Sequence, residues 1–233
     1  MLKVRYAHIH IFVFAVIWLG LYLDGIEKSM QMYTNIIVIM AYIWVYRFTS
    51  SSVKQLMLFG LLVAFLGEVL FALVFGMYTY RLQNLPIYVP FGHALIYSSV
   101  YYIVKEPLVK AYEKTIIKIL YFSMITYSLF WLFFANDTFG FICMLVILAL
   151  FKRYPHTKLF FLFMYFTIVY LELLGTYYGC WQWPEVWFDK VTFISSANPP
   201  SGISVFYFGF DIGCLWLYKQ YDKKRWSRLK RLR

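Results

Sequence analysis

The chain has 233 residues, of which 62% are hydrophobic and 23% aromatic, and its mean hydropathy is +0.65. A soluble domain is nearer half apolar, so this composition excludes an ordinary soluble protein and points to the lipid bilayer as the main partner. The formal net charge of +11 does not indicate nucleic-acid binding, because the basic residues are spread over short segments between apolar runs.

Eight apolar runs approach the length of about 20 residues that an α-helix needs to cross a bilayer. Irregular backbone cannot face lipid, and the runs lack the alternation of barrel strands, so each is expected to be a helix. The predicted fold is an all-α polytopic membrane protein of about eight transmembrane helices, with spans at residues 7–23, 30–46, 55–76, 87–104, 115–135, 137–151, 159–180 and 202–218.

The basic residues predict how these spans are oriented. If the N-terminus is cytoplasmic, the cytoplasmic segments contain all but three of the 22 Lys and Arg residues, the exceptions being Lys28, Arg81 and Lys190. Such an asymmetry sets the orientation of membrane proteins. Both termini are therefore predicted to be cytoplasmic, and residues 219–233 are predicted to form a basic cytoplasmic tail that rests on anionic lipid.

An internal likeness divides the membrane part into two halves, residues 1–110 and 111–218, each with four predicted spans. An even number of spans in each half means that both halves insert in the same direction, related by a pseudo-two-fold axis along the membrane normal. The likeness is carried by Glu68 and its counterpart Glu172, and by Pro90-Phe91-Gly92 with Tyr97, which match Pro200-Ser201-Gly202 with Tyr207 at the same spacing.

Ionisable residues within apolar runs mark the candidate functional site, because a charge in lipid is costly and normally faces protein or a cavity. Glu68 and Glu172 lie in the predicted outer halves of the third and seventh spans. His93 and Asp211 each share a helix face with a tyrosine four residues away. We expect these four catalytic candidates to converge in the outer half of the bilayer.

Aromatic residues follow both acids and complete this candidate site. A carboxylic acid desolvated among them can hold a proton near neutral pH, as a general acid must. The alternative interpretation is structural, with the acids joining helices by hydrogen bonds and the aromatic residues forming an interfacial belt. The candidates for substrate binding are Tyr78, Tyr80, Arg81, Tyr97, Trp181, Trp183 and Tyr207.

Spacings typical of metal or cofactor sites do not occur around these residues. His93 lacks an HxxxH or ExxH partner, and Cys143, Cys180 and Cys214 are isolated from one another. Glycine-rich phosphate loops and serine or cysteine nucleophile motifs are also missing. We therefore expect neither a metal nor a cofactor, and interpret the cysteines as buried thiols.

The first acidic segment resembles the carotenoid-biosynthesis integral membrane family, which includes hydratases of acyclic carotenoid ends. The resemblance lies in Glu68-x7-Gly76-Met-Tyr78-Thr-Tyr80, followed by Leu85-Pro86 and Val89-Pro90. Glu172 with Trp181-Gln-Trp183 is similar to the second acidic segment of that family. Asn198-Pro199-Pro200 departs from the single-proline segment found there.

A looser likeness connects the chain to the membrane subunits of copper monooxygenases, which also join an acid to a W-x-W loop. The metal ligands of those enzymes cannot be traced in this sequence. The carotenoid-family resemblance implies hydration of a terminal carbon–carbon double bond in the bacterial inner (plasma) membrane, without a redox cofactor.

The resulting hypothesis is an integral membrane enzyme that acts on a long hydrophobic substrate of isoprenoid or carotenoid type. Glu68 or Glu172 would protonate a double bond, water held by the other acid or by Asp211 would add, and the aromatic faces would stabilise the cation. Two alternatives stay open, a proton-coupled carrier of a small solute and a non-catalytic assembly subunit. The substrate and the oligomeric state are also open.

Overall fold

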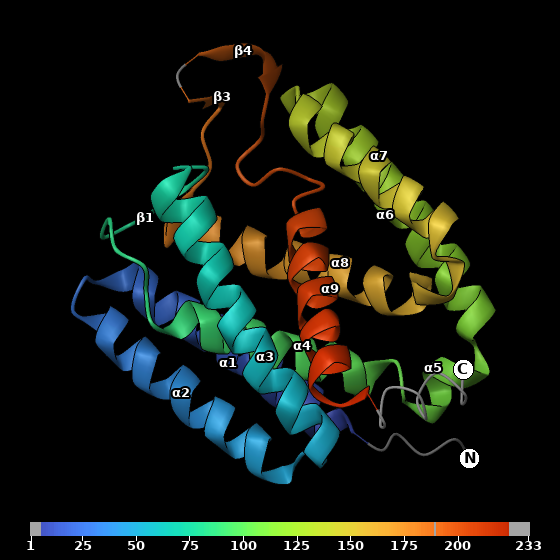
Figure 1. Ribbon diagram of the computed structural model, residues 1–233. Coiled ribbons are helices and arrows are strands. Elements are labelled where there is room, and N and C mark those ends of the chain that lie inside the picture. Colours follow the sequence, from blue (N-terminus) through green and yellow to red (C-terminus); the bar gives the residue numbers. More distant parts are fainter. Residues whose placement is uncertain (1–5, 189, 224–233) are drawn as a thin grey trace.

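The computed structural model describes residues 6–188 and 190–223, and it is predominantly helical (Figure 1). Each predicted span is found as a helix, which confirms the all-α fold. A short helix α5 (Pro107–Ala111) joins α4 to α6, a π-helical segment η1 (Val69–Val74) extends α3, and a 3₁₀ turn η2 (Pro155–Thr157) precedes α8. The long helices are α1 (Ala7–Ile26), α2 (Met30–Phe48), α3 (Ser51–Glu68), α4 (Tyr88–Ile103), α6 (Glu113–Ala135), α7 (Thr138–Arg153), α8 (Lys158–Tyr177) and α9 (Ser204–Tyr221).

Within the described residues, four helical segments are long and apolar enough to cross a membrane, as expected of a membrane protein. They are Ala7–Ile26, Ser51–Val74, Glu113–Ala135 and Pro155–Tyr177. The remaining long helices are shorter or more polar. Helices α4 and α7 have 16 residues each, so each is about 24 Å long, against a hydrocarbon thickness of about 30 Å.

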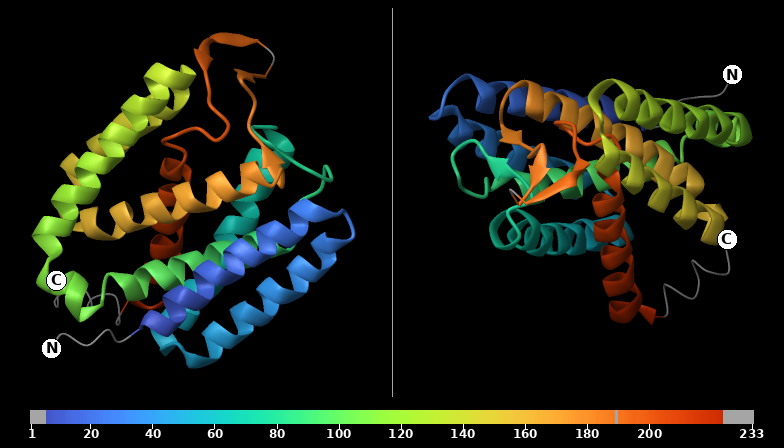
Figure 2. Two further views of the ribbon diagram at one scale, coloured as in Figure 1. Left: turned by 180° about the vertical axis from the view of Figure 1, so that it is seen from behind. Right: turned by 90° about the horizontal axis from the view of Figure 1, so that it is seen from above.

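Four helices form the centre of the molecule. Helix α3 packs against α4 and α9, and α8 packs against the same two helices, so the four close a ring. Helices α1 and α2 pack on α4 at one side, and α6 and α7 form a separate pair at the other side, where α6 contacts α8 (Figures 1 and 2). The first two helices of each half are therefore placed differently: α1 and α2 both pack on α4, whereas, in the described part of the chain, α6 packs on α8 and not on α9.

The loops that follow α1, α3, α6 and α8 contact one another at one end of the molecule. Arg81 donates through its side chain to the Gly25 carbonyl at 3.2 Å and through its backbone N–H to the Cys180 carbonyl at 2.9 Å. The Ser195 hydroxyl donates to the Asn136 carbonyl. This end of the molecule is called the loop end below.

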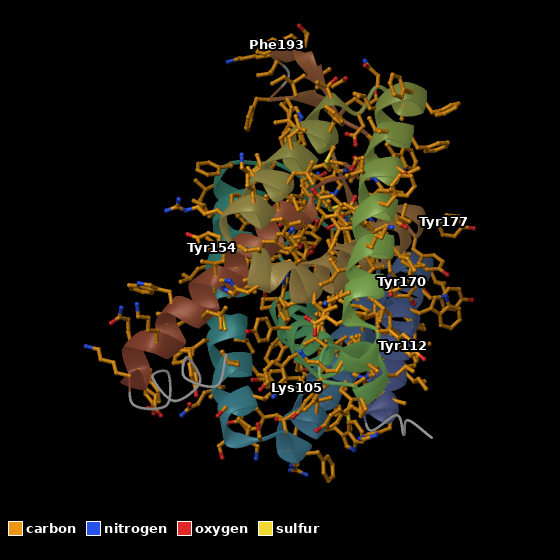
Figure 3. All side chains as sticks on the ribbon, turned by 90° about the vertical axis from the view of Figure 1, so that its right-hand side faces the viewer. Lys105, Tyr112, Tyr154, Tyr170, Tyr177 and Phe193 are labelled. Carbon is orange, nitrogen blue, oxygen red and sulfur yellow. The ribbon has the colours of Figure 1, made fainter. Side chains whose placement is uncertain are left out.

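The start of α1 meets the end of α4 at the opposite end of the molecule. The backbone N–H of Tyr6 donates to the Glu106 carboxylate at 2.5 Å, and His10 lies 3.3 Å from the same oxygen. Figure 3 places Lys105 near this end and Phe193 at the tip of the loop end. The long helices thus run between two distinct ends.

Short strands occur only at the loop end among the described residues. Strand β1 (Thr79–Tyr80) pairs antiparallel with β2 (Trp181–Gln182), which joins the segment after α3 to the segment after α8. Strands β3 (Val186–Trp187) and β4 (Val191–Ser195) form a hairpin that projects beyond the helices (Figure 1).

A buried aspartate holds the segment before α9 against the start of α7. Asn136 ends α6 in the left-handed conformation, with φ 52°, which asparagine tolerates better than most residues. Asp137 is 0% exposed and accepts hydrogen bonds from three backbone N–H groups, those of Gly140 (3.1 Å), Ala197 (3.0 Å) and Ser201 (2.7 Å). One carboxylate therefore caps α7 and positions the entry into α9.

We predict that Asp137→Ala lowers the free energy of unfolding by about 3 kcal/mol or more, because three buried N–H groups lose their acceptor at about 1–3 kcal/mol each. Thermal unfolding of the purified protein in detergent measures the change. The matched control is Glu113→Ala, since Glu113 is exposed and faces only an exposed Lys110. Equal melting of Asp137→Ala and the control would contradict the proposed anchoring.

Candidate functional site

Two buried carboxylates, Glu68 at the end of α3 and Glu172 in the last third of α8, line one cavity at the loop end of the central ring. Glu68 is 3% exposed and Glu172 is 2% exposed. The two acids therefore border a common space. Among the described residues, neither carboxylate forms a hydrogen bond or ion pair with a Lys or Arg side chain.

Glu68 is surrounded by three hydrogen-bonding groups. The hydroxyls of Tyr78 and Tyr80 both donate to Oε2, at 2.5 and 2.7 Å. On the other oxygen, Oε1 lies 3.1 Å from Nε2 of His93, whose side chain is 9% exposed. Burial, reinforced by the Glu68 carboxylate, raises the pKa of both loop tyrosines well above its usual value, so their hydroxyls stay protonated.

Glu172 is surrounded in the same way by a different set of side chains. The indole N–H groups of Trp181 and Trp183 both donate to Oε2, at 2.8 and 2.9 Å. The hydroxyl of Tyr207 donates to Oε1 at 2.9 Å. Each buried carboxylate therefore has three polar neighbours, which offsets much of the cost of removing it from water.

The two acids are followed by the same local structure. A glycine with positive φ ends each helix, Gly76 at 59° and Gly179 at 68°, where a Cβ would be strained. An aromatic-x-aromatic pair follows, and its polar tips return to the acid. Seven residues separate Glu68 from Gly76 but six separate Glu172 from Gly179. The π-helical η1 accommodates the additional residue, because its turns are one residue longer than α-helical turns.

The pairing of β1 with β2 brings the two aromatic pairs together. Thr79, between Tyr78 and Tyr80, pairs with Gln182, between Trp181 and Trp183. The Tyr78 and Trp183 rings are 4.5 Å apart, and those of Tyr80 and Trp181 are 6.2 Å apart. The loop end of the cavity is therefore closed by four interlocked aromatic side chains.

The cavity has about 880 Å³ of empty space, including its open edge, and a largely apolar lining. Its far side is formed by buried residues of α1 and α2, among them Ile17, Leu21 and Val38. The rings of Phe71, Phe206 and Phe210 line it between η1 and α9, and all three remain partly exposed. Sequence reasoning missed these lining residues, because an apolar side chain in an apolar span carries no distinguishing signal.

His93 separates this cavity from a second, smaller one. Its ring stacks on Tyr207 with centroids 4.7 Å apart, and both rings line both cavities. Asp211 and Tyr97 line the smaller cavity and not the larger one. The structure thus brings Glu68, Glu172 and His93 together, and places Asp211 in the adjoining cavity.

Arg81 does not reach either acid of the cavity. Its guanidinium contacts Asp24 at 3.4 Å and the Glu27 carbonyl at 3.0 Å, so it ties the loop after α3 to the end of α1. Asp24 is 0% exposed and also accepts the hydroxyl of Tyr88 at 2.9 Å. Sequence analysis overlooked Asp24, although an acid near the end of an apolar run was the available signal.

The two acids differ in the chemistry of their hydrogen-bonding neighbours. An indole N–H can only donate, so Oε2 of Glu172 accepts two hydrogen bonds and does not itself carry a proton. Glu68 faces tyrosines and a histidine, whose ring nitrogen either donates or accepts. A proton can therefore be shared between Glu68 Oε1 and His93 Nε2. Within the described part of the chain, no three His, Cys, Asp or Glu side chains cluster as metal ligands.

We predict that Gly175→Ala disturbs the site, because a Cβ at this position would lie 2.0 Å from the Trp181 ring. Trp181 is buried and bound to Glu172, so the clash should break that hydrogen bond and destabilise the protein by about 1–3 kcal/mol. Thermal unfolding and tryptophan fluorescence report the change. In the control Gly209→Ala, the new methyl meets nothing within 4 Å and should stabilise α9 by about 0.5–1 kcal/mol. Similar melting of both variants would show that the Gly175 contact is unimportant.

Comparison with known proteins adds no relative to this geometry. No protein-family model, no curated protein and no solved structure matches the chain. The likeness to the carotenoid-biosynthesis family therefore rests on the motifs around Glu68 and Glu172.

Proposed function

We propose that the chain is a membrane enzyme that adds water to a double bond of a long isoprenoid or carotenoid-like substrate, in the bacterial plasma membrane. One observation carries this proposal: two buried carboxylates of different hydrogen-bonding chemistry line one largely apolar cavity. An apolar lining favours a hydrocarbon ligand, and a few convergent polar groups are typical of a reactive site. The partly exposed Phe71, Phe206 and Phe210 provide an apolar edge through which such a chain would enter from lipid.

In the proposed reaction Glu68 is the acid. Its proton moves to one carbon of the double bond, and the π electrons form the new C–H bond, which leaves a tertiary cation on the other carbon. The Glu172 carboxylate and the faces of Tyr78 and Trp183 stabilise this cation. Water adds to the cation, and the proton that it loses returns to Glu68. The net change is the addition of one water molecule, and no electrons are exchanged.

A proton-coupled carrier is the second candidate, and the smaller cavity behind His93 is the observation that favours it. Two cavities on either side of a His93–Tyr207 pair would offer access from both ends in turn. A carrier would give proton-dependent uptake into proteoliposomes that is lost in Glu172→Gln. An enzyme would instead convert its substrate in detergent, without a sealed membrane.

We further propose eight spans with both termini cytoplasmic and the cavity in the outer half of the bilayer. The contacts between the loops after α1, α3, α6 and α8 support this topology, because those loops alternate with the basic connections. Short α4 and α7 would require a locally thinner bilayer. Lys3, Arg5 and most of the basic tail lie outside the described residues.

A pseudo-two-fold relation between the halves is also proposed. The glycine–aromatic–x–aromatic segments support it, since Thr79 pairs with its own counterpart Gln182, as residues beside a two-fold axis do. The proline segments are less alike, because Pro90 lies inside α4 whereas Pro200 precedes α9. The relation is thus proposed for α3, α4, α8 and α9. It would map the contact between α3 and α4 onto the contact between α8 and α9, and the contact between α3 and α9 onto the contact between α8 and α4.

The topology predicts which inserted reporters are external. A tag at Asn84 should be accessible only from outside the cell, and a tag in the 152–158 connection only from the cytoplasm. A further reporter is expected to be external at Asp189 and cytoplasmic at the end of the chain, after Arg233. Both positions lie outside the described residues. A cytoplasmic signal at Asn84 would reverse the proposed orientation and move the cavity to the inner leaflet.

Glu68→Gln and Glu172→Gln should each reduce product formation by roughly 100-fold or more, the scale of lost acid–base catalysis. The double variant should be little worse than either, because the acids act as a unit. Mass spectrometry of isoprenoid lipids, from cells that carry each variant and from purified protein, measures the product.

The control is Glu185→Gln, which changes an exposed acid at the same end of the molecule. Glutamine keeps an acceptor for the two indole N–H groups, so the fold should survive in Glu172→Gln. The proposed function would be refuted if cells without the gene, cells with wild-type protein and cells with either variant all had the same isoprenoid profile.

A further inference from the structure

Asp211 of α9 is a buried carboxyl with an unpartnered oxygen. The residue is 6% exposed, and its Oδ2 has no hydrogen-bond partner within the described residues. By contrast, the carboxyl groups of Glu68 and Glu172 each have three hydrogen-bonding neighbours. A buried polar atom without a partner is costly and calls for a functional reason or a bound water molecule.

The unpartnered oxygen belongs to a residue that lines the smaller cavity. This cavity lies between α3, α4, α8 and α9 and has room for about one water molecule. His93, Ile96, Tyr207 and Phe210 line it and also line the larger cavity. The space is polar on the side of Asp211 and His93, which is the condition for holding an ordered water molecule.

Among the described residues, no Lys or Arg side chain lines this cavity to pair with Asp211. From α4 the titratable groups are His93 and Tyr97, and from α9 they are Tyr207 and, one turn further, Cys214. Helices α3 and α8 contribute Gly60, Ala64 and Met164, none of which titrates.

His93 is the connection between the two cavities. Its Nε2 faces Glu68 Oε1 at 3.1 Å, and the residue also lines the cavity of Asp211. An imidazole accepts a proton on one nitrogen and releases another from the second, so it can pass a proton from one side of the ring to the other.

We propose that Asp211 is a proton store that keeps Glu68 in its acid form, through a water molecule and His93. The Asp211 carboxyl gives its proton through the water to Nδ1 of His93, and the proton on Nε2 moves to Glu68. One proton is transferred and Asp211 becomes a carboxylate. The reverse movement returns a proton to Asp211, and Glu68 then takes up the proton that the added water loses. The proposal rests on the proposed function of Glu68, but the proton path itself does not depend on the substrate.

Infrared difference spectroscopy of the purified protein in nanodiscs, titrated with pH without substrate, tests the path. Wild-type protein should show the C=O band of a protonated carboxyl that disappears in Asp211→Asn. His93→Gln, which interrupts the path but leaves Asp211, should keep the band and shift its titration midpoint. A band unchanged in Asp211→Asn, or a midpoint unaffected by His93→Gln, would overturn the proposal.

Turnover gives a second readout. Asp211→Asn and His93→Gln should each lower kcat by roughly tenfold or more with KM nearly unchanged, and the double variant should be no slower than the slower single one. An unchanged kcat in Asp211→Asn also overturns the proton store. If no isoprenoid is hydrated by wild-type protein, the proposed function fails, and the infrared measurement alone decides the path. If Asp211→Asn does not fold, His93→Gln still decides it through the midpoint.

Discussion

The need to bury two carboxylates inside an apolar helix ring is the constraint on which the rest of the site depends. An unpaired carboxylate in such surroundings would be very costly, and within the described residues neither Glu68 nor Glu172 contacts a Lys or Arg side chain. The cost is offset by neutral donors that come from the loop just beyond each acid and from the next helix. The positive-φ glycines reverse the chain, the paired strands hold the returning aromatic residues, and η1 corrects their register.

The same donors divide the chemical roles between the acids. Tryptophan can only donate, so the two indoles hold one oxygen of Glu172 as an acceptor. Tyrosine and histidine are more versatile, so Glu68 can gain and lose a proton without leaving a neighbour unsatisfied. The difference between Tyr-x-Tyr and Trp-x-Trp, which looks conservative in sequence, therefore gives the two acids different hydrogen-bonding neighbours.

Structural support for the site comes from contacts beside the cavity. Arg81, a candidate for substrate binding from the sequence, ties the loop after α3 to the carboxylate of Asp24 at the end of α1. Asp137 performs the corresponding task for the segment between β4 and α9. Both sets of contacts depend on a fully buried aspartate at the loop end, Asp24 in one and Asp137 in the other. Arg81, Asp24 and Asp137 hold these segments in place and do not line the cavity.

The sequence by itself determined the helical membrane architecture, because runs of apolar residues near membrane-spanning length admit few other structures. It also identified Glu68, Glu172 and His93, since charge in an apolar span is unusual wherever the chain folds. Tertiary structure alone decided which partners these groups have. The pairing of Thr79 with Gln182, the contact of Arg81 with Asp24 and the separation of Asp211 by the His93–Tyr207 stack join residues from different helices. Helix packing sets such contacts, and hydropathy does not encode which spans become neighbours.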